Sequence, residues 1–484
     1  MKRYVIGLDE GTTSARSVVY DTATHKIVAM NSMGFKQYYP FDGWVESDAE
    51  EIYKAQIYTL NKVIKESGIS LDDVIGVGIT NQRESVVAWD RNTGKPIYNA
   101  IIWQCRRTSK IIERIPDNIK RVIKEKTGLL ADAYFSASKM AWILKNVPTA
   151  KVLLKQNALC MGTIDSYLAF RLTGKFVTDT TNASRTMLFN INTLKWDDEL
   201  LRYFGIPESV LPKVVASDEK IGGLIKYNNI PLCGIIGDQQ ASLLGQACTQ
   251  KGEGKATYGT GCFVLLNSGD KTPKNVDKLL TTIAYTIRNK TYYALEGSVF
   301  SACNAINWLR DNLKIIKSPA ETSDMAKSLS GNEGVYFVPA FTGLGAPYWN
   351  SDARGTICGM TLNTNKNHIV RSVLESIAYN THAILQEMEK ANVSVKELHV
   401  DGGGSKNDFL LQHQADISRK KILRSGESEG TVLGAIYCVL ISNNMLNFDD
   451  IERLYNVKHE FLPQMSLADS KKCFAGWQNA VNKC

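Results

Sequence analysis

A short acidic, hydroxyl-rich turn near the N-terminus has the residues needed to bind a phosphate group. In the segment GLDEGTTSARSVVYD, residues 7–21, an apolar strand leads into Asp9, then a Gly-Thr-Thr-Ser turn, then a second β-rich run. A carboxylate at a strand end can hold hydrated Mg²⁺ beside phosphate oxygens. Backbone N–H groups around Gly11 can approach a phosphate without a Cβ in the way. Taken alone, the same pattern also describes an ordinary β-hairpin.

Two glycine-rich turns in the second half of the chain follow predicted strands. The first is Tyr258-Gly259-Thr260-Gly261, and the second is DGGGSKN, residues 401–407, after the strand 397–400. Successive backbone amides in such turns can bind a phosphate, and Asn407 can read the edge of a planar group. A flexible turn without a ligand is the alternative interpretation of each.

An acidic residue ends a buried-type strand at Gly237-Asp238-Gln239-Gln240. At that place Asp238 can act as a general base and accept the proton of an alcohol that attacks a phosphoryl group. The alternative is a helix N-cap, a role to which Asp is equally suited.

A set of residues far apart in the sequence could recognise a polyol. The adjacent Arg83 and Glu84 can donate to and accept from neighbouring hydroxyls, and aromatic side chains can cover the C–H face of the ligand. We take Trp103, Tyr134 and Phe263 as those aromatic residues.

The elements that must position these residues form two similar α/β halves. A chain of 484 residues exceeds the size at which single cores stop growing. Near residue 250 the opening pattern of strand, Gly/Thr turn and strand starts again, so we expect domains at 1–248 and 249–484. Ser47 and Glu50 predict a capping box for a helix that carries Ile52 and Ile64, and the tail after Asn447 predicts a docked helical end.

Composition excludes several classes of protein. The chain is 44% hydrophobic and 22% charged, as soluble globular proteins are, and no stretch is apolar enough for a membrane span or a signal peptide. Ten scattered cysteines without metal-site spacing predict reduced thiols in a cytoplasmic protein. The net charge of +8 is densest over residues 106–126, where we predict a solvated amphipathic helix interrupted near Pro116 rather than a surface for nucleic acid or membrane.

Many ordered segments together resemble the FGGY carbohydrate kinase family, and most closely its branch that acts on glycerol. The resemblance runs from about residue 3 to about residue 445. It rests on these segments, in order: GLDEGTTSARSVVYD, GWVESD, ITNQRES, WQCRRT, YFSASKMAWIL, TDTTNASRTML, GDQQASLLGQ, TYGTGCFVLLN, ALEGSV, FTGLGAPYWNSDARG, RSVLESIAY, VDGGGSKNDFL and TVLGAIY.

The resemblance implies a fold of two actin-like (ribonuclease H-like) α/β domains flanking a deep interdomain cleft. It implies Mg-ATP-dependent phosphorylation of glycerol to sn-glycerol 3-phosphate, with a homodimer as the expected assembly and a tetramer as the alternative. Two other functions stay open: a kinase of the same family for another polyol or sugar, and a catalytically idle actin-like nucleotide-binding protein.

The resemblance also implies roles for single residues. Asp238 matches the general base, and Asp9 matches the residue that helps position Mg²⁺. The residues that match glycerol contacts are Arg83, Glu84, Trp103, Tyr134, Asp238, Gln239 and Phe263. The residues that match the nucleotide site are Thr12, Thr13, Ser14 and Arg16 on the first phosphate loop, Thr260 on the second, and Cys303, Asn307, Gly403 and Asn407 around the nucleoside.

Three positions depart from the family pattern. Cys105 stands where an Asp is usual, which removes a carboxylate that could pair with Arg106 or Arg107. Cys303 and Asn307 stand where a Gly and a Gln are usual, and they put the affinity for the nucleotide in question.

Overall fold

The computed structural model describes residues 2–274, 276–426 and 429–484. The chain forms two compact units. The first contains Met1–Ala247, Thr281–Tyr293 and Glu429–Leu454, and the second contains Cys248–Leu280, Ala294–Ser428 and Tyr455–Cys484. The units are therefore interleaved in sequence, whereas the sequence analysis expects a single boundary after residue 248. The difference arises because a late helix, α14 (Gly430–Ser442), packs on the sheet of the first unit.

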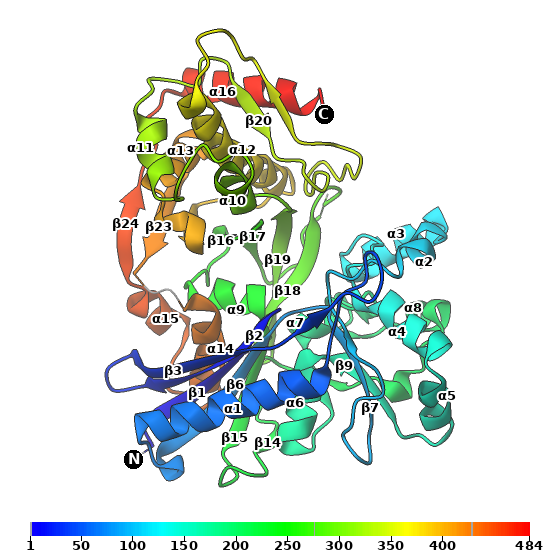
Figure 1. The fold of residues 1–484 in the computed structure, drawn as a ribbon. Helices are drawn as coiled ribbons and strands as arrows, with labels where there is room; N and C mark the ends of the chain where they lie inside the picture. The colour runs from blue at the N-terminus through cyan, green and yellow to red at the C-terminus, as the bar shows by residue number, and fades with distance from the viewer. Residues whose placement is uncertain (1, 275, 427–428) are drawn as a thin grey trace. The chain divides into compact units, whose positions relative to one another are not determined.

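A six-stranded sheet forms the centre of the first unit (Figure 1). Its strands, in spatial order, are β14 (Gly222–Gly223), β15 (Pro231–Gly237), β6 (Val74–Asn81), β1 (Tyr4–Glu10), β2 (Ser14–Asp21) and β3 (Lys26–Gly34). β1, β6 and β15 are parallel, and Glu10, Asn81 and Gly237 lie in register at their ends. The sheet thus brings the segments containing Asp9, Arg83 and Asp238 to one edge.

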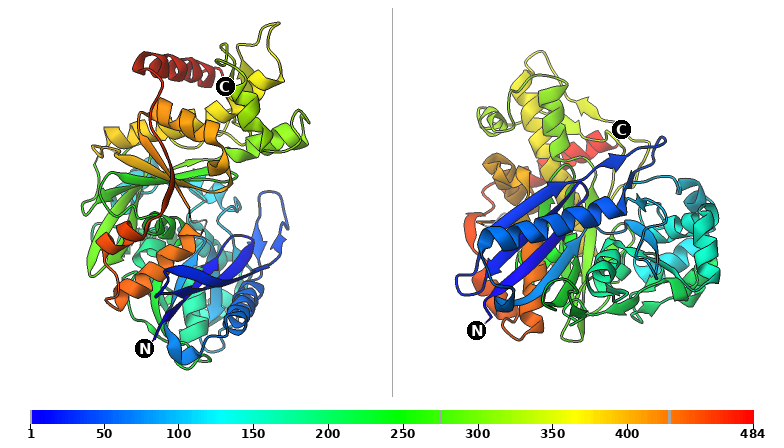
Figure 2. Two further views of the ribbon diagram at one scale, coloured as in Figure 1. Left: turned by 90° about the vertical axis from the view of Figure 1, so that its left-hand side faces the viewer. Right: turned by 60° about the horizontal axis from the view of Figure 1, so that its bottom comes forward.

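Helices cover the two faces of this sheet. Side chains alternate between faces along a strand, and Ile6 and Leu8 of β1 belong to the same apolar core as residues of α1 (Ala49–Ser67), which lies across β1 to β3 (Figure 2). On the opposite face, Gly7 and Gly78 make room for α14, because a Cβ on Gly78 would lie 2.5 Å from the carbonyl oxygen of Ala435.

The N-terminus of α1 differs from its prediction by one residue. Asp48 is the N-cap, and its carboxylate accepts a hydrogen bond from the backbone N–H of Glu50 at 2.8 Å. The predicted cap at Ser47 is wrong because Ser47 lies in β5 (Glu46–Ser47), paired with Ala100.

Smaller sheets and short helices complete the first unit. One further sheet has the order β4 (Gln37–Tyr38), β5, β8 (Ala100–Ile101), β7 (Val86–Asp90) and β9 (Leu159–Thr163), and two pairs are β10 (Val177–Asp179) with β13 (Lys213–Val215) and β11 (Phe189–Asn190) with β12 (Lys195–Trp196). The remaining helices are α4 (Ser136–Asn146), α5 (Pro148–Lys155), α6 (Ile164–Thr173), α7 (Thr180–Ala183), α8 (Asp198–Phe204), α9 (Asp238–Gly245) and α15 (Phe448–Leu454), with short 3₁₀ turns at Leu71–Asp73 and Glu208–Val210.

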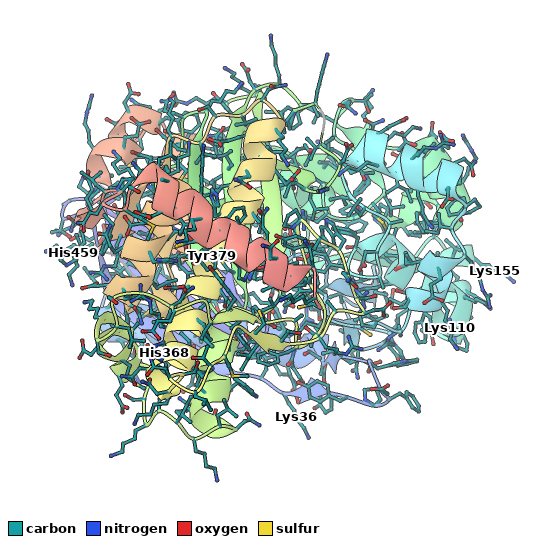
Figure 3. The ribbon with its side chains drawn as sticks, turned by 90° about the horizontal axis from the view of Figure 1, so that it is seen from above. Lys36, Lys110, Lys155, His368, Tyr379 and His459 are labelled. Carbon is teal, nitrogen blue, oxygen red and sulfur yellow. The ribbon has the colours of Figure 1, made fainter. Side chains whose placement is uncertain are left out.

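The basic segment is helical and broken at the predicted place. α2 (Ser109–Glu113) and α3 (Asp117–Thr127) are separated at Pro116, which lacks the N–H that a helix interior needs. Lys110 of α2 is exposed, and Figure 3 shows it near the periphery, as it does Lys155 at the end of α5. These positions are typical of a solvated helix face.

A seven-stranded sheet, most of which belongs to the second unit, has the same central order as the six-stranded sheet, although residues 281–293 of two of its strands group with the first unit. Its strands, in spatial order, are β18 (Leu280–Ile287), β19 (Lys290–Val299), β17 (Cys262–Gly269), β16 (Glu253–Tyr258), β22 (Glu397–Asp401), β23 (Lys421–Ser425) and β24 (Val457–Phe461). β16 is antiparallel to β17 and parallel to β22, as β1 is antiparallel to β2 and parallel to β6. The predicted repetition of strand, Gly/Thr turn and strand is confirmed at the level of the sheet.

The helices of the second unit surround a large apolar core. They are α10 (Cys303–Asp311), α11 (Glu321–Lys327), α12 (Lys366–Lys390), α13 (Asp408–Ser418) and α16 (Leu467–Val481), with a 3₁₀ turn at Gly403–Lys406 and a strand pair β20 (Tyr336–Val338) and β21 (Thr356–Cys358). α16 docks through Trp477, whose ring stacks on Tyr379 of α12 with centroids 5.7 Å apart. This confirms the predicted helical end, although β24 in the same tail was not expected.

In the parts of the chain that the structure describes, no helix is both long enough and apolar enough to cross a membrane.

Candidate active site

Arg83 and Glu84 lie in the turn between β6 and β7, and both are buried. Glu84 has a φ of 61°, a left-handed conformation that costs a non-glycine residue free energy. Hydrogen bonds hold the turn: Ser85 donates its N–H to the carbonyl of Arg83 at 2.8 Å and its hydroxyl to Gln82 at 2.8 Å. The surrounding contacts thus fix a strained corner, as is common at functional sites.

Arg83 connects this corner to the end of β15. Its Nε lies 3.1 Å from Oδ1 of Asp238, and its Nη1 donates to Gln240 at 3.2 Å. Asp238 is the first residue of α9, and the preceding Gly237 is the N-cap. The side chain of Asp238 is 30% exposed, whereas that of Arg83 is almost fully buried. A carboxylate oriented by a buried guanidinium, yet open to solvent, is suited to meet a substrate hydroxyl. Gln239 follows on the first turn of the same helix.

Glu84 has a partner that the sequence analysis missed. Nε of Arg185 lies 2.6 Å from Oε1 of Glu84, and both side chains are buried. The Arg185 guanidinium also lies 5.7 Å from the ring centroid of Tyr134. Arg185 belongs to the segment TDTTNASRTML that supported the resemblance, but one sequence could not reveal that this arginine folds back onto Glu84.

The aromatic residues of the first unit lie next to the first predicted phosphate loop. Trp103 and Tyr134 make an edge-on contact with ring centroids 5.7 Å apart. The indole N–H of Trp103 donates to the hydroxyl of Thr12 at 3.1 Å. The structure therefore brings Trp103 and Tyr134, two of the predicted polyol residues, next to the predicted phosphate turn. Phe263, the remaining predicted wall residue, lies on β17 in the second unit and is half-buried.

The β1–β2 turn places its carboxylates in a crowded anionic environment. Burial, opposed by Arg16 and reinforced by Asp238 and Glu429, raises the pKa of Asp9 to about 7. Glu10 is buried, and its Oε2 has no hydrogen-bond partner among the residues that the structure describes. Arg16 lies opposite Asp9 on β2 and pairs with Glu429. Gly11 closes the turn by donating its N–H to the carbonyl of Ser14 at 2.9 Å, and Thr13 at its tip is exposed.

These carboxylates fit a hydrated Mg²⁺ better than a fully protein-bound metal. In the described part of the chain, no group of three or more His, Cys, Asp or Glu is arranged to hold a metal ion. Mg²⁺ usually keeps several waters and binds through one or two carboxylates together with substrate phosphates. The raised pKa of Asp9 and the buried carboxylate of Glu10 indicate a place where a cation would offset negative charge.

In the second unit, the β16–β17 turn docks on the start of α10. Backbone N–H groups of Ala302 and Asn304 donate to the carbonyl of Thr260 at 3.0 and 3.2 Å, and that of Cys303 donates to Gly259 at 3.1 Å. Thr260 itself is exposed. This turn is the counterpart of the β1–β2 turn.

The other predicted nucleotide residues gather around the same helix start. A Cβ on Gly404 would lie 2.5 Å from the sulfur of Cys303, so the glycine-rich loop that includes Gly403 approaches α10 closely. Asn307 is exposed one turn after Cys303. Asn407 caps α13: its side-chain oxygen accepts from Leu410 at 3.0 Å and its amide donates to Thr322 at 2.9 Å. Burial raises the pKa of Cys303 to about 11, so its thiol is protonated at neutral pH.

Cys105 does not leave its neighbouring arginines without carboxylates. Arg107 pairs with Glu46 at 2.6 Å and donates Nε–H to the sulfur of Cys105 at 3.0 Å. Arg106 pairs with Asp132 at 2.6 Å. Both arginines therefore have a carboxylate partner although Cys105 stands where an Asp is usual.

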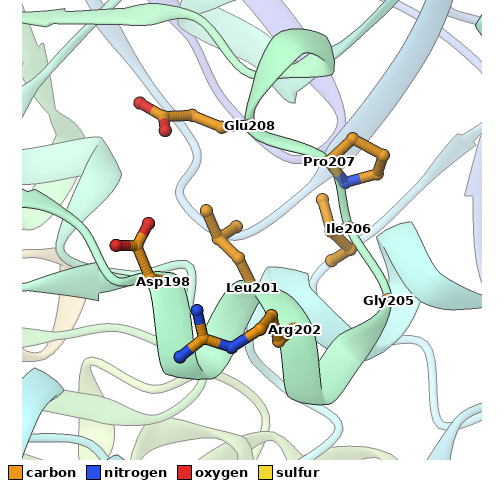
Figure 4. A pocket seen from close by; sticks show the side chains of 7 residues that line it. All are labelled: Asp198, Leu201, Arg202, Gly205, Ile206, Pro207 and Glu208. Atoms are coloured by element: carbon orange, nitrogen blue, oxygen red, sulfur yellow. The ribbon is translucent and has the colours of Figure 1, made fainter.

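Two surface cavities lie elsewhere in the first unit. One, of about 320 Å³, is formed by α8 and the residues after it and is lined by Asp198, Leu201, Arg202, Gly205, Ile206, Pro207 and Glu208 (Figure 4). The other, of about 620 Å³, is lined by residues that include Asp48, Lys54 and Arg171. Neither of these two cavities contains a predicted site residue.

Comparison with known families defines the class of protein. The model for the FGGY family of carbohydrate kinases, N-terminal domain, matches residues 4–245, and the model for the C-terminal domain matches residues 254–442. The chain belongs to the FGGY family of carbohydrate kinases.

Individual relatives are similar over the whole chain. Glycerol kinase of Thermococcus onnurineus (strain NA1) is 48% identical over 487 residues, covering 100% of this chain and 98% of the relative. Among solved structures, Plasmodium falciparum glycerol kinase with ADP has a TM-score of 0.93 at 37% identity, covering 99% of this chain and 98% of that chain. Ligand-bound xylulose kinase from Lactobacillus acidophilus has a TM-score of 0.87 at 25% identity, covering 99% and 96%. The expected fold class of two actin-like α/β domains is confirmed.

Proposed function

We propose that this protein is a glycerol kinase, which transfers the γ-phosphoryl group of ATP to glycerol and yields sn-glycerol 3-phosphate and ADP. The observation that carries the proposal is the full-length identity of 48% with a glycerol kinase. The Arg83–Glu84 corner supports it, since a guanidinium and a carboxylate side by side suit the adjacent hydroxyls of a small polyol.

Asp238 is the proposed general base. As a terminal hydroxyl oxygen of glycerol bonds to the γ-phosphorus, the bond from that phosphorus to the bridging oxygen of ADP breaks, and the hydroxyl proton passes to the Asp238 carboxylate. Arg83 orients this carboxylate from 3.1 Å. Glu84, Tyr134 and Gln239 hold the polyol, and Trp103 and Phe263 cover its apolar edge.

Nucleotide-binding residues are proposed in each of the two units. Thr12, Thr13, Ser14 and Arg16 form the first phosphate loop and Thr260 the second, while Cys303, Asn307, Gly403 and Asn407 lie around the nucleoside. Asp9 would hold Mg²⁺, which would neutralise charge on the phosphates when bound. Because phosphoryl transfer asks little covalent chemistry of the protein, positioning and electrostatics supply most of the acceleration.

We also propose that the protein is cytoplasmic and that it forms a homo-oligomer. All ten cysteines lie among the described residues as thiols and not in disulfides, and six of them are buried, which suits a cytoplasmic protein. The expected assembly is a homodimer, with a tetramer as the alternative, and light scattering of the purified protein distinguishes them.

The test measures ADP production with Mg-ATP and glycerol, dihydroxyacetone, erythritol, xylulose or gluconate. We predict that glycerol gives the highest kcat/KM and that Asp238→Asn lowers kcat by about 10²–10⁴-fold. Asp198→Asn is the matched control because Asp198 lines the separate cavity at α8. Higher turnover with a sugar would assign the protein to another branch of the family, and nucleotide binding without turnover of any acceptor would identify an idle nucleotide-binding protein.

A further inference from the structure

Lys139, in the first turn of α4, occupies an unfavourable position for a cation. Its side chain is fully buried. Burying an ammonium group costs free energy unless its N–H groups have acceptors, and the N-terminal end of a helix carries partial positive charge. Burial lowers the pKa of Lys139 to about 7. The contacts of its amine must therefore account for its placement.

The Lys139 amine lies among three backbone carbonyls from two segments. Nζ donates to the carbonyl of Tyr134, to that of Phe135 at 3.3 Å and to that of Glu84 at 3.5 Å. Three acceptors match the three N–H donors of an ammonium group. Ser136 Oγ donates to the same Glu84 carbonyl at 3.1 Å. The first turn of α4 thus holds the backbone of Glu84, whose left-handed φ of 61° needs such support.

We propose that Lys139 is a positioning residue whose ammonium group fixes Glu84 relative to Tyr134 and thereby sets the affinity for the polyol. The inference rests on the proposed function, because it assigns Glu84 and Tyr134 to the polyol. Lys139 acts through the backbone of these residues and does not touch the reacting atoms.

The hydrogen bonds by which Lys139 fixes Glu84 relative to Tyr134 depend on the protonation of its amine. Apart from burial, the charged or titratable groups that influence it are Glu84, Cys105, Asp132 and Arg106. Below a pH of about 7, the ammonium donates to all three carbonyls. Above that pH, the neutral amine has two N–H groups and a lone pair that repels the third carbonyl. The polyol affinity therefore falls as the pH rises through about 7.

The experiment compares full-length wild type with Lys139→Met, which keeps an unbranched side chain one atom shorter and removes its donors. KM for the polyol, KM for ATP and kcat are measured from about pH 6 to about pH 8.5, a range that brackets the titration. We expect Lys139→Met to raise the polyol KM about tenfold or more, to leave the ATP KM within about twofold, and to lose the pH dependence of the polyol KM. Lys126→Met is the control. Lys126 belongs to α3 and forms an ion pair with Asp197, with 2.9 Å between Nζ and Oδ1, and it makes no contact that the argument about Lys139 uses.

An unchanged polyol KM and an unchanged pH profile in folded Lys139→Met would overturn the inference. If that variant does not fold, Ser136→Ala decides, since it removes the other donor to the Glu84 carbonyl. A polyol KM raised about threefold supports the inference that contacts to the Glu84 carbonyl set the polyol affinity, and an unchanged polyol KM refutes it. If wild type prefers xylulose to glycerol, the proposed function fails, while the same comparison with xylulose still tests Lys139.

Discussion

Glu84 is held in place by hydrogen bonds from three other residues of the first unit. Its carboxylate accepts from Arg185, and its carbonyl accepts from Ser136 and Lys139. A buried ion pair contributes little net stability compared with apolar packing, but removal of one partner typically costs about 3–5 kcal/mol. The arrangement therefore gives a defined position to the carboxylate that we propose binds the polyol, rather than a more stable fold.

A second buried carboxylate gives a pH-dependent stability that can be measured. Asp165 of α6 accepts from the hydroxyl of Thr178 at 2.7 Å, and burial raises its pKa from the ordinary 3.8 to about 7. The unfolded chain loses this proton near 3.8, whereas the folded chain keeps it up to about 7. Between these values the folded state binds more protons, so its free energy of unfolding falls as the pH rises.

We predict that Asp165→Asn removes this part of the pH dependence. The difference in urea midpoint between variant and wild type should shift in favour of the variant from about pH 5 to about pH 7 and then stay constant. Urea unfolding at several pH values tests this, and the difference cancels the contributions of buried carboxylates that do not interact with Asp165. A constant difference over the whole range would show that Asp165 is already ionised in the folded state.

At the scale of elements, the packing of α14 depends on small residues. A Cβ on Gly434 would lie 2.0 Å from the carbonyl oxygen of Ala241 in α9, and backbone cannot move aside as a side chain can. We predict that Gly434→Ala lowers the free energy of unfolding by about 3 kcal/mol or more, at the upper end of overpacking costs. Chemical denaturation measures this.

The control for this packing prediction is Gly34→Ala. A Cβ on Gly34 would meet its nearest atom at 3.7 Å, which is ordinary contact. A loss of stability in Gly434→Ala no larger than in Gly34→Ala would mean that α14 and α9 can separate without cost.

Elements with local signals could be predicted from the sequence. β1 and β2 follow from their apolar runs, and the break at Pro116 follows from the missing N–H. The sequence predicts the cap of α1 one residue early, because Ser and Asp are both good caps. Only the pairing of Ser47 with Ala100 of β8 shows that the cap is Asp48. Arg185 and Lys139 could not be predicted, since their roles come from partners about 100 and 55 residues away in sequence.

At the scale of the whole molecule, the same strand order occurs twice and puts one phosphate-type turn in each unit. In the proposed function, the polyol residues Arg83 and Glu84 lie in the first unit, and the residues around the nucleoside lie in the second. The two KM values should therefore respond separately to substitutions in the two units.

We predict that Gly404→Ala raises the KM for ATP about tenfold and leaves the KM for glycerol within about twofold. The reason is that a Cβ at this position would lie 2.5 Å from the sulfur of Cys303 and displace that side chain. Steady-state kinetics with each substrate varied in turn measure both constants.

Gly331→Ala serves as the control in the second unit, where the nearest atom to an added Cβ is 4.0 Å away. If Gly404→Ala raised the glycerol KM as much as the ATP KM, the assignment of the two substrates to residues of different units would be contradicted.

The interleaving of the units bears on how the protein is made. The face of the first sheet that carries Gly7 and Gly78 is covered by α14, which begins at Gly430, although the first long segment of that unit ends at Ala247. At about 5–20 residues per second, a ribosome needs roughly 10–40 s to synthesise the intervening chain. During that interval the nascent first unit has an uncovered sheet face, so it is a natural client for chaperones until the late helix emerges.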